Sequence, residues 1–307
     1  MVLDLATPVS LVALVAIVLA VAYAFWRHAL LSLTLSVAIL VVFALQVLTD
    51  DLVLADDLVL ADLALIRIGE FYSAPWTWVT FQFVHAGPTH LMLNLLGMLL
   101  IAPVFEERVG SARFAVLFFA GGALGAAGFL LLNLSQFGLV LVGASAGISA
   151  ILGAYGRLYP RDRVALFLPL PGVPSLPVLE VVIGFLVLET ALSLLPSFGV
   201  SFGSNVAWEA HVIATIFGFA AAPLVMRIPA GKVRVRKATP VAGLRDLATT
   251  AELTSILGEA EGADIPELRE AWIEKFVAKA RCPQCGGALR MRFGRLGSDC
   301  GWKRRIG

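Results

Sequence analysis

Long stretches without a charged side chain constrain this chain more than any other feature of its sequence. Residues 5–26 run for 22 residues without a charge, residues 29–49 for 21, and residues 114–156 for 43. A helix needs about 20 apolar residues to cross a membrane, so the longest run is two helices rather than one. Because 59% of the residues are hydrophobic and 15% are charged, a soluble core of this size could not bury the apolar surface. The sequence predicts a polytopic membrane protein and excludes a soluble enzyme or a disordered chain.

Seven membrane-spanning helices account for the apolar runs, since further spans fit residues 90–105, 177–196 and 207–227. Asp4, with no lysine or arginine before it, is unlike the start of a signal peptide, so the first run is interpreted as a true span. Lysine and arginine gather after the first, third, fifth and seventh spans, which marks the cytoplasmic side. We therefore expect a multi-pass protein of the cell membrane with its N-terminus outside and its C-terminal tail in the cytoplasm.

The outer segment 50–88 is long and carries six carboxylates together with many apolar residues. The hexapeptide Asp-Asp-Leu-Val-Leu-Ala occurs at 50–55 and again at 56–61, a period that matches neither a helix nor a strand. Trp76 and Trp78 follow this repeat, and indoles prefer the boundary between membrane and water. The segment is expected to lie in the membrane interface.

Four polar side chains are predicted to lie in one layer near the outer end of the spans. Ser145 stands five residues into the span that starts near 140, and His211 four residues into the span that starts near 207. At ~1.5 Å per residue both lie within roughly 6–9 Å of the outer end. His90 and Asn94 begin the third span and share a helix face, as residues four apart do. Such residues are costly in a membrane, so the layer predicts a functional site.

Serine and histidine at one depth are typical of nucleophilic catalysis. A serine hydroxyl is a weak nucleophile that needs a base within hydrogen-bonding distance, and imidazole has the right pKa for that role. The amide of Asn94 and the imidazole of His90 can donate to a developing oxyanion, an effect of typically ~3–4 kcal/mol per donor.

The sequence places no carboxyl group to complete a triad with His211. Glu209 precedes it by two residues and so points away, about 200° around the helix. A Ser–His dyad is therefore predicted. Glu189, inside the sixth span, keeps two interpretations: a protonated carboxyl group hydrogen-bonded to a neighbour or a residue facing an aqueous cavity, or a role in gating or water access.

Residues 143–147 read Gly-Ala-Ser-Ala-Gly and match the G-x-S-x-G nucleophile elbow. That motif needs a strand, a turn and a helix of an α/β-hydrolase, whereas the sequence predicts a membrane helix here, so the hydrolase interpretation fails. Small residues at such spacing usually indicate close helix packing, which remains the alternative for this serine taken alone.

Further short motifs occur along the chain in a characteristic order. They are Trp78 to Phe83, His85, His90 to Asn94, Glu107 to Gly110, Gly143 to Ser145, Ala210 with His211, and Gly218. With these motifs the chain resembles the rhomboid intramembrane serine proteases over about residues 30–228. The resemblance implies an all-α polytopic membrane protein, with a six-helix rhomboid core and one extra N-terminal transmembrane helix.

The resemblance also implies roles for the polar layer. Ser145 would be the nucleophile and His211 the general base, while His90 and Asn94, with the backbone N–H of Ser145, would form the oxyanion hole. His85 would be a structural residue of the outer loop. The sixth span and the loop after it would admit a substrate helix. Structural residues near the site would be Gly143, Gly147 and Gly218.

Three positions depart from the pattern of the family. Ala146 and Ala214 replace glycines, and a methyl group at either site is expected to push two helices apart slightly. Ser149 stands where many members carry a tyrosine that stacks on the histidine. The orientation of His211 must then come from another contact.

The tail after residue 228 differs in composition from the rest of the chain. It begins as a basic linker, and helices are expected at 241–258 and 265–280, where Asp264 and Pro266 are a start signal. We divide the chain into an extra N-terminal helix, a rhomboid-like core, a basic linker with a helical segment, and a degenerate zinc-ribbon-like tail: 1–28, 29–228, 229–281 and 282–307.

The only cysteines of the chain, Cys282, Cys285 and Cys300, lie in this tail. The first two form a zinc knuckle, but a ribbon needs a second pair, and position 297 is Gly. Asp299 or a partner protein is the candidate source of a fourth ligand. Zinc binding and a former ribbon that folds without metal both remain open. Free thiols fit a reducing cytoplasm.

The sequence thus predicts an intramembrane serine endopeptidase that hydrolyses peptide bonds in or near transmembrane segments. Catalysis of this kind needs no cofactor. The expected partners are transmembrane protein substrates and the lipid bilayer, and not nucleic acid. The alternative is a rhomboid-like pseudoprotease that binds transmembrane helices without cleaving them. A transporter or channel is disfavoured, because the spans show no internal repeat and the polar layer lies off the midplane.

Overall fold

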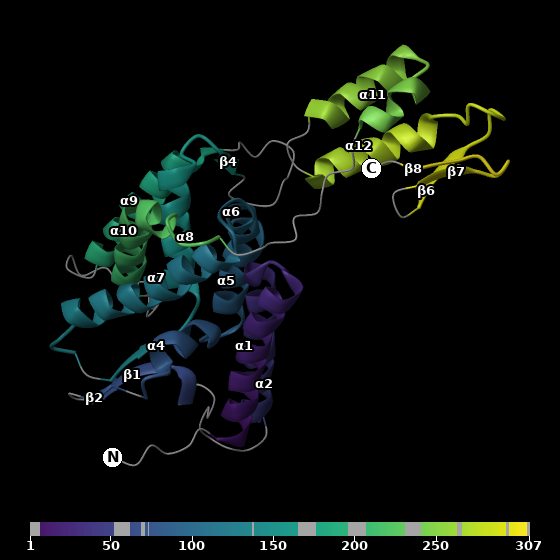
Figure 1. The fold of residues 1–307 in the computed structure, drawn as a ribbon. Coiled ribbons are helices and arrows are strands. Elements are labelled where there is room, and N and C mark those ends of the chain that lie inside the picture. The colour runs from purple at the N-terminus through teal and green to yellow at the C-terminus, as the bar shows by residue number, and fades with distance from the viewer. Residues whose placement is uncertain are drawn as a thin grey trace. The chain divides into compact units, whose positions relative to one another are not determined.

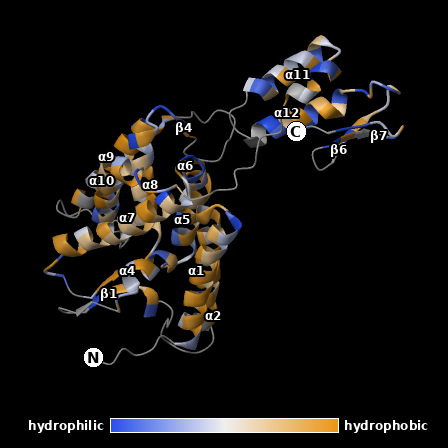
Figure 2. Cartoon of the chain, viewed as in Figure 1, coloured by the Kyte–Doolittle hydropathy of each residue, from blue (hydrophilic) through white to orange (hydrophobic). Residues whose placement is uncertain are grey.

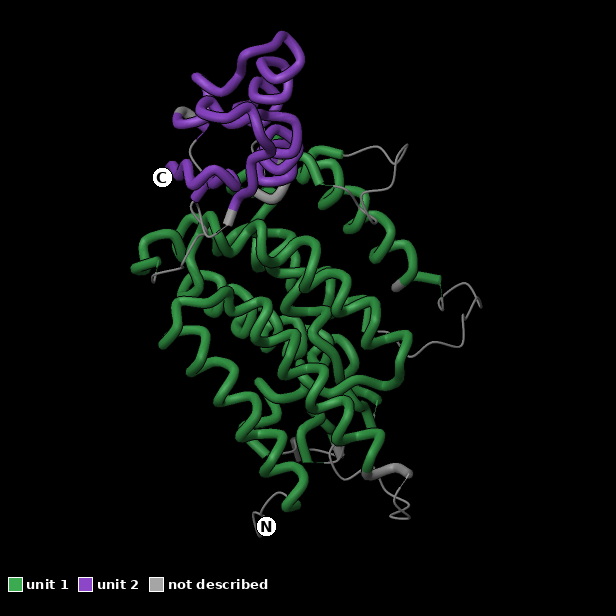
Figure 3. Tube along the Cα trace, turned by 90° about the vertical axis from the view of Figure 1, so that its right-hand side faces the viewer, with its two compact units in different colours: residues 1–234 green, residues 235–307 purple. Residues whose placement is uncertain are grey.

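The computed structural model describes most of the chain, in two compact units formed by residues 1–234 and 235–307 (Figure 3). The described residues are 7–51, 62–68, 71–72, 74–136, 138–164, 176–195, 207–230, 241–262, 266–292 and 295–305. Most of the hexapeptide repeat, the loop after the sixth span, Asp264 and most of the basic residues of the linker lie outside them.

The first unit is built from apolar helices that coincide with the predicted spans (Figures 1 and 2). They are α1 (Pro8–Arg27), α2 (Leu31–Asp51), α5 (Pro88–Leu100), α6 (Ala102–Val109), α7 (Ser111–Leu132), α8 (Ser145–Leu158), α9 (Val178–Leu194) and α10 (Trp208–Val225). Five described segments, with α5 and α6 counted as one, are long and apolar enough to cross a membrane. The prediction of a mostly helical integral membrane protein is confirmed.

Two of the predicted spans are shorter than the others. Helix α8 has 14 residues and α9 has 17, so each is under the length that the five longer segments reach. Helix α8 is nonetheless the most buried helix of the first unit, because it lies between α7 and α10 and also meets α9. A helix surrounded by other helices can start inside the membrane when the backbone before it is satisfied by protein.

Short strands join distant parts of the first unit, which the sequence did not predict. β1 (Leu65–Ile68) pairs antiparallel with β2 (Phe71–Tyr72) and with β3 (Leu139–Leu141), and β4 (Arg163–Val164) pairs with β5 (Leu176–Pro177). The outer segment continues through α4 (Thr77–Thr80) and the 3-10 turn η1 (Phe81–Phe83). These strands are two to four residues long, too short for any periodic pattern to appear in the sequence.

Helices α8 and α10 touch backbone to backbone because glycine occupies the crossing on each side. A Cβ atom on Gly218 would lie 1.9 Å from the carbonyl oxygen of Ala150, and one on Gly153 would lie 2.0 Å from that of Thr215. Around the crossing the two helices bury a cluster of alanines: Ala146, Ala150, Ala210 and Ala214. Small residues that let helices approach are the usual basis of association in a membrane.

We expect Gly218→Ala to destabilise the protein by about 1–3 kcal/mol, because the added methyl group must displace the α8 backbone. The matched control is Gly184→Ala in α9, where a Cβ atom would meet nothing within 4 Å. Alanine is the better helix former, so the control is expected to keep or slightly raise stability. Thermal unfolding in detergent compares the two, and equal melting temperatures would contradict the close crossing.

The second unit has its own hydrophobic core. It contains the 3-10 helix η3 (Ala242–Leu247), α11 (Ala251–Gly262), α12 (Pro266–Lys279) and a sheet of β6 (Leu289–Arg292), β7 (Arg295–Ser298) and β8 (Lys303–Arg305), in the order β6-β7-β8. The prediction of one helix over 241–258 is wrong, because Thr250 accepts a hydrogen bond from the amide of Leu253 and begins a new helix. Helix α12 begins at Pro266, close to the predicted start.

Candidate active site

Ser145 is the first residue of α8, and the chain reaches it through β3 and a turn. The prediction that it lies five residues inside a helix is wrong. The backbone before Ser145 is instead hydrogen-bonded to other segments of the chain. Leu141 is aligned with Leu65 of β1, and the amide of Gly143 donates to the carbonyl of Phe81 at 2.9 Å. The strand, turn and helix that the G-x-S-x-G motif needs are thus present locally, within a membrane unit.

Gly143 allows this turn. Its φ of +106° is one that residues with a side chain rarely adopt. A Cβ atom there would also lie 2.6 Å from Cε1 and from Nε2 of His90. The turn before Ser145 therefore has the His90 imidazole directly against it.

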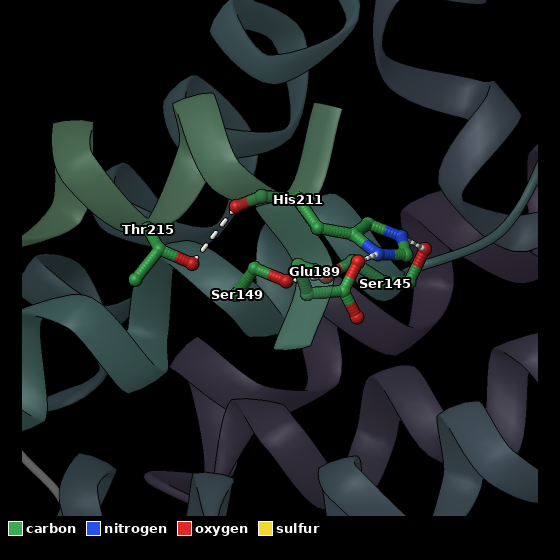
Figure 4. Close-up of polar contacts among 5 residues, drawn as sticks. All are labelled: Ser145, Ser149, Glu189, His211 and Thr215. Carbon is green, nitrogen blue, oxygen red and sulfur yellow. Dashed lines mark hydrogen bonds and ion pairs between the residues drawn. The ribbon is translucent and has the colours of Figure 1, made fainter. Parts of the chain in front are cut away.

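Ser145 and His211 are in hydrogen-bonding contact. The hydroxyl oxygen of Ser145 lies 2.7 Å from Nε2 of His211, which is the fourth residue of α10 (Figure 4). One turn deeper, Thr215 donates to the carbonyl of His211, and Ser149 donates to that of Ser145, both within their own helices. The predicted pair of side chains is brought together although 66 positions separate them in sequence.

A carboxyl group also reaches His211, which corrects the expectation that none is placed to do so. Oε2 of Glu189, on α9, lies 2.9 Å from Nδ1 of His211 (Figure 4). Both side chains are nearly buried, at 7% and 12% exposure. Glu209 is the only carboxyl group of α10, and spacing along one helix says nothing about a residue on its neighbour. The position of Glu189 toward the outer end of its span was the available signal.

Aromatic rings enclose the histidine on two sides. The ring of Phe185, on α9, is stacked at 6.4 Å between centroids and 30° between planes, and that of Trp208 meets it edge-on at 6.2 Å. Many family members are expected to carry a tyrosine at position 149 that stacks on the histidine. Ser149 makes no such contact. Its hydroxyl bonds to the backbone of Ser145 instead.

His90 and Asn94 lie beside the turn that precedes Ser145. Nδ1 of His90 accepts from the amide of Ala86 at 3.4 Å, so a neutral ring carries its proton on Nε2, the atom near Gly143. Nδ2 of Asn94 donates to the carbonyl of His90 at 2.9 Å and lies 3.8 Å from the position of a Cβ atom on Gly143. Each side chain can therefore present an N–H group near Ser145.

His85 has the surroundings of a structural residue. It is 1% exposed, and its Nδ1 lies 3.3 Å from the carbonyl oxygen of Phe83. Its backbone N–H donates to the side-chain amide oxygen of Gln46, and its carbonyl oxygen accepts from the side-chain amide nitrogen of Gln46. Burial, and secondarily the neighbouring His90, lowers the pKa of His85 to about 4. The ring is therefore neutral near pH 7 and donates to the loop backbone.

The alanines that replace family glycines are accommodated by a glycine on α7. A Cβ atom on Gly125 would lie 3.1 Å from Cβ of Ala214 and 3.3 Å from Cβ of Ala146. The absence of a side chain at Gly125 makes room for both methyl groups. Gly147 faces Gln82 and Phe118, whose atoms would lie 2.6 Å and 2.8 Å from a Cβ atom there.

The three cysteines of the second unit lie together. Their sulfur atoms are all within 4.8 Å of one another, and those of Cys282 and Cys300 are 3.7 Å apart. Tetrahedral zinc with Zn–S bonds of ~2.3 Å separates two sulfurs by ~3.8 Å, so the group can hold a metal ion. Hydrogen bonds, first from Ser298 and then from Cys300, lower the pKa of the Cys285 thiol to about 7. Asp299 is outside the group and pairs with Arg290 at 3.6 Å.

Comparison with known proteins identifies the family of this chain. The sequence profile of the Rhomboid domain matches residues 72–228, just over half of the chain. The chain belongs to the rhomboid family. Two relatives of this rhomboid are "Putative rhomboid protease YdcA" of Bacillus subtilis (strain 168), 35% identical over 80 residues, and "Rhomboid-related protein 3" of Homo sapiens, 32% identical over 92 residues.

The similarity to these relatives is partial. The matched segments cover 26% and 30% of this chain, and 39% and 22% of the bacterial and the human protein. The chain therefore spans well under half the length of either relative.

Proposed function

We propose that this rhomboid is an intramembrane serine endopeptidase that hydrolyses peptide bonds in or near the transmembrane segments of other membrane proteins. The observation that carries the proposal is the 2.7 Å contact between the Ser145 hydroxyl and Nε2 of His211, in a helical membrane unit. A serine paired with an imidazole is the activated nucleophile of acyl transfer.

The positions of the side chains support the following reaction. His211 takes the proton of Ser145 through Nε2 as the serine oxygen attacks the carbonyl carbon of the substrate. The N–H groups of His90 and Asn94 and the backbone N–H of Ser145 donate to the oxyanion. The last of these is free of a helical partner because Ser145 starts α8. His211 then gives the proton to the leaving amine, and water hydrolyses the acyl-enzyme by the reverse sequence of proton transfers.

We place the site toward the outer face of the cell membrane, with the N-terminus outside and the tail in the cytoplasm. The support is the distribution of basic residues. Arg108 and Arg113 lie between the third and fourth proposed spans, Arg157 follows the fifth, and Arg227 follows the seventh. The division of the chain at 28, 228 and 281 is part of the same proposal.

The experiment that tests the function is cleavage of a model transmembrane substrate by the purified protein in liposomes. We expect a defined cut within or next to the substrate's transmembrane segment. Binding of the substrate without cleavage would favour the pseudoprotease. In that case Ala146 and Ala214 are the first positions to restore to glycine.

We further propose that the second unit binds one zinc ion through the thiolates of Cys282, Cys285 and Cys300. The short distances among the three sulfur atoms support this zinc site. Catalysis in the membrane unit does not require the metal. We expect about one zinc per chain in the protein purified without chelator, and loss of the metal in the double variant Cys282→Ser with Cys285→Ser.

A gain-of-ligand variant sharpens this test. Gly297→Cys restores the second cysteine pair, and a Cβ atom there meets only the carbonyl of Trp302 at 3.8 Å, so the fold has room. We expect Gly297→Cys to hold zinc against a chelator concentration that strips the wild type. Wild-type protein that is free of zinc after purification in zinc-containing buffer would exclude the proposal.

A further inference from the structure

We propose that Glu189 is a positioning residue for His211, so that the site operates as a triad of Ser145, His211 and Glu189 from three separate helices. The inference rests on the proposed protease function and adds to it a residue that the dyad does not include. The close contact between Glu189 and His211 is its starting point.

In the proposed triad Glu189 is ionised and sets which nitrogen of His211 carries the proton. An ionised carboxylate can only accept a hydrogen bond, so Nδ1, which lies 2.9 Å from Oε2 of Glu189, is then the donor. In the neutral ring Nε2 then has a free lone pair, and this lone pair faces the hydroxyl of Ser145 at 2.7 Å. This is the tautomer that a general base needs, and Glu189 selects it.

The surroundings make the pairing strong. Glu189 is buried and lies in an apolar helix of the membrane unit, where an isolated carboxylate would be very unfavourable. Removal of the serine proton turns His211 into an imidazolium, and the nearby carboxylate then becomes the partner of a full positive charge. A buried charge pair at this distance stabilises the charged histidine that forms during the reaction.

The ring of His211 is held by two residues of one face of α9. Phe185 and Glu189 are four positions apart and so lie on the same face, one stacked on the ring and the other bonded to Nδ1. Ser149 has no ring to stack on the histidine, and its hydroxyl bonds to the carbonyl of Ser145. The ring contact from Phe185 and the Nδ1 contact from Glu189 both come from α9.

A role in substrate entry is the competing explanation, since α9 was expected to form part of the entrance for a substrate helix. The two roles differ in what they change. A positioning residue changes kcat and the reactivity of Ser145 toward any small electrophile. A residue of the entrance changes KM for a transmembrane substrate and leaves the reactivity toward a small molecule unaltered.

The test compares Glu189→Gln, Glu189→Asp and the control Glu180→Gln with the wild type. Glu180 is on the same helix, is exposed, and undergoes the same chemical change. For each protein we would measure kcat and KM with a transmembrane substrate, the rate of Ser145 labelling by a small fluorophosphonate, and the melting temperature. We expect Glu189→Gln to lower kcat and the labelling rate together by about 10²-fold or more, within the ~10⁴-fold loss known for a triad without its carboxylate.

We expect KM to change less than about threefold, Glu189→Asp to recover part of the rate, and Glu180→Gln to match the wild type. Wild-type kcat and labelling in Glu189→Gln would overturn the inference, as would a rise in KM alone or a loss that only follows a lower melting temperature. The function itself fails separately, if the wild type neither cleaves nor labels or if Ser145→Ala still cleaves.

Discussion

Replacement of Ser145 by alanine is expected to lower the rate of substrate cleavage by ~10⁴-fold or more, to the background of the assay. The change removes only the hydroxyl oxygen that lies 2.7 Å from Nε2 of His211. Without it the histidine has no proton to accept and the carbonyl carbon no nucleophile. His211→Ala is expected to have an effect of similar size, and the double variant to be no worse than either, because the two groups act as one unit.

The matched control is Ser149→Ala, one turn further along α8. Its hydroxyl bonds to the carbonyl of Ser145 and not to the histidine, so we expect cleavage within a fewfold of the wild type. The measurement is the initial rate of cleavage in liposomes, with substrate binding followed in parallel. Equal residual activity in Ser145→Ala and Ser149→Ala would exclude Ser145 as the nucleophile.

Replacement of Glu106 by alanine is expected to destabilise the membrane unit by about 3 kcal/mol or more, because each buried donor left without an acceptor costs about 1–3 kcal/mol. Glu106, on α6, is 0% exposed. Its carboxylate accepts from the backbone amides of Leu31 and Ser32 at 2.6 Å and 2.7 Å and from the hydroxyl of Ser111 at 2.5 Å. It therefore caps the start of α2 from another helix, and its loss leaves several buried donors without an acceptor.

The neighbouring Glu107 is the control, because it is exposed on the same helix. We expect Glu107→Ala to change stability by less than about 1 kcal/mol. Glu106→Gln should fall between the wild type and Glu106→Ala, since an amide retains one acceptor oxygen. Thermal unfolding in detergent measures all three. Equal melting temperatures for the alanine variants at 106 and 107 would contradict the cap.

Much of the candidate site was predictable because polar and ionisable side chains are energetically unfavourable in apolar membrane helices. A histidine at the start of an apolar helix, or a serine between glycines in a charge-free run, stands out in a sequence in which 15% of the residues are charged. Depth along each predicted helix then placed Ser145 and His211 in one layer without any knowledge of how the helices pack. The contact between them agrees with that placement.

Glu189 stands out in the sequence for the same reason, but the sequence does not indicate that it contacts His211. Its depth indicated the outer part of the membrane, but depth leaves open which way a side chain points around its helix. That direction is set by the packing of α9 against α10, which no spacing within α9 records. The same reason explains Glu106, whose partners Leu31 and Ser32 lie more than 70 positions away.

The start of α8 at Ser145 shows the corresponding limit for local structure. Residues 139–144 are apolar or small and fit the inner part of a membrane helix as well as a strand. The pairing of β3 with β1 and the positive φ of Gly143 decide in favour of the strand and turn. Both depend on segments that are distant in sequence, so the turn that presents the serine is a tertiary feature.

The sequence by itself determined the membrane class and the approximate spans, and it singled out Ser145 and His211 as candidate reactive side chains. These follow from single-residue transfer energies and helical spacing, which act locally along the chain. Only the tertiary structure decided that a third helix brings Glu189 to His211, that α8 begins at Ser145, and that the three cysteines meet. Those contacts join residues on separate elements, and their geometry is fixed by how the helices and strands pack rather than by the pattern within any one of them.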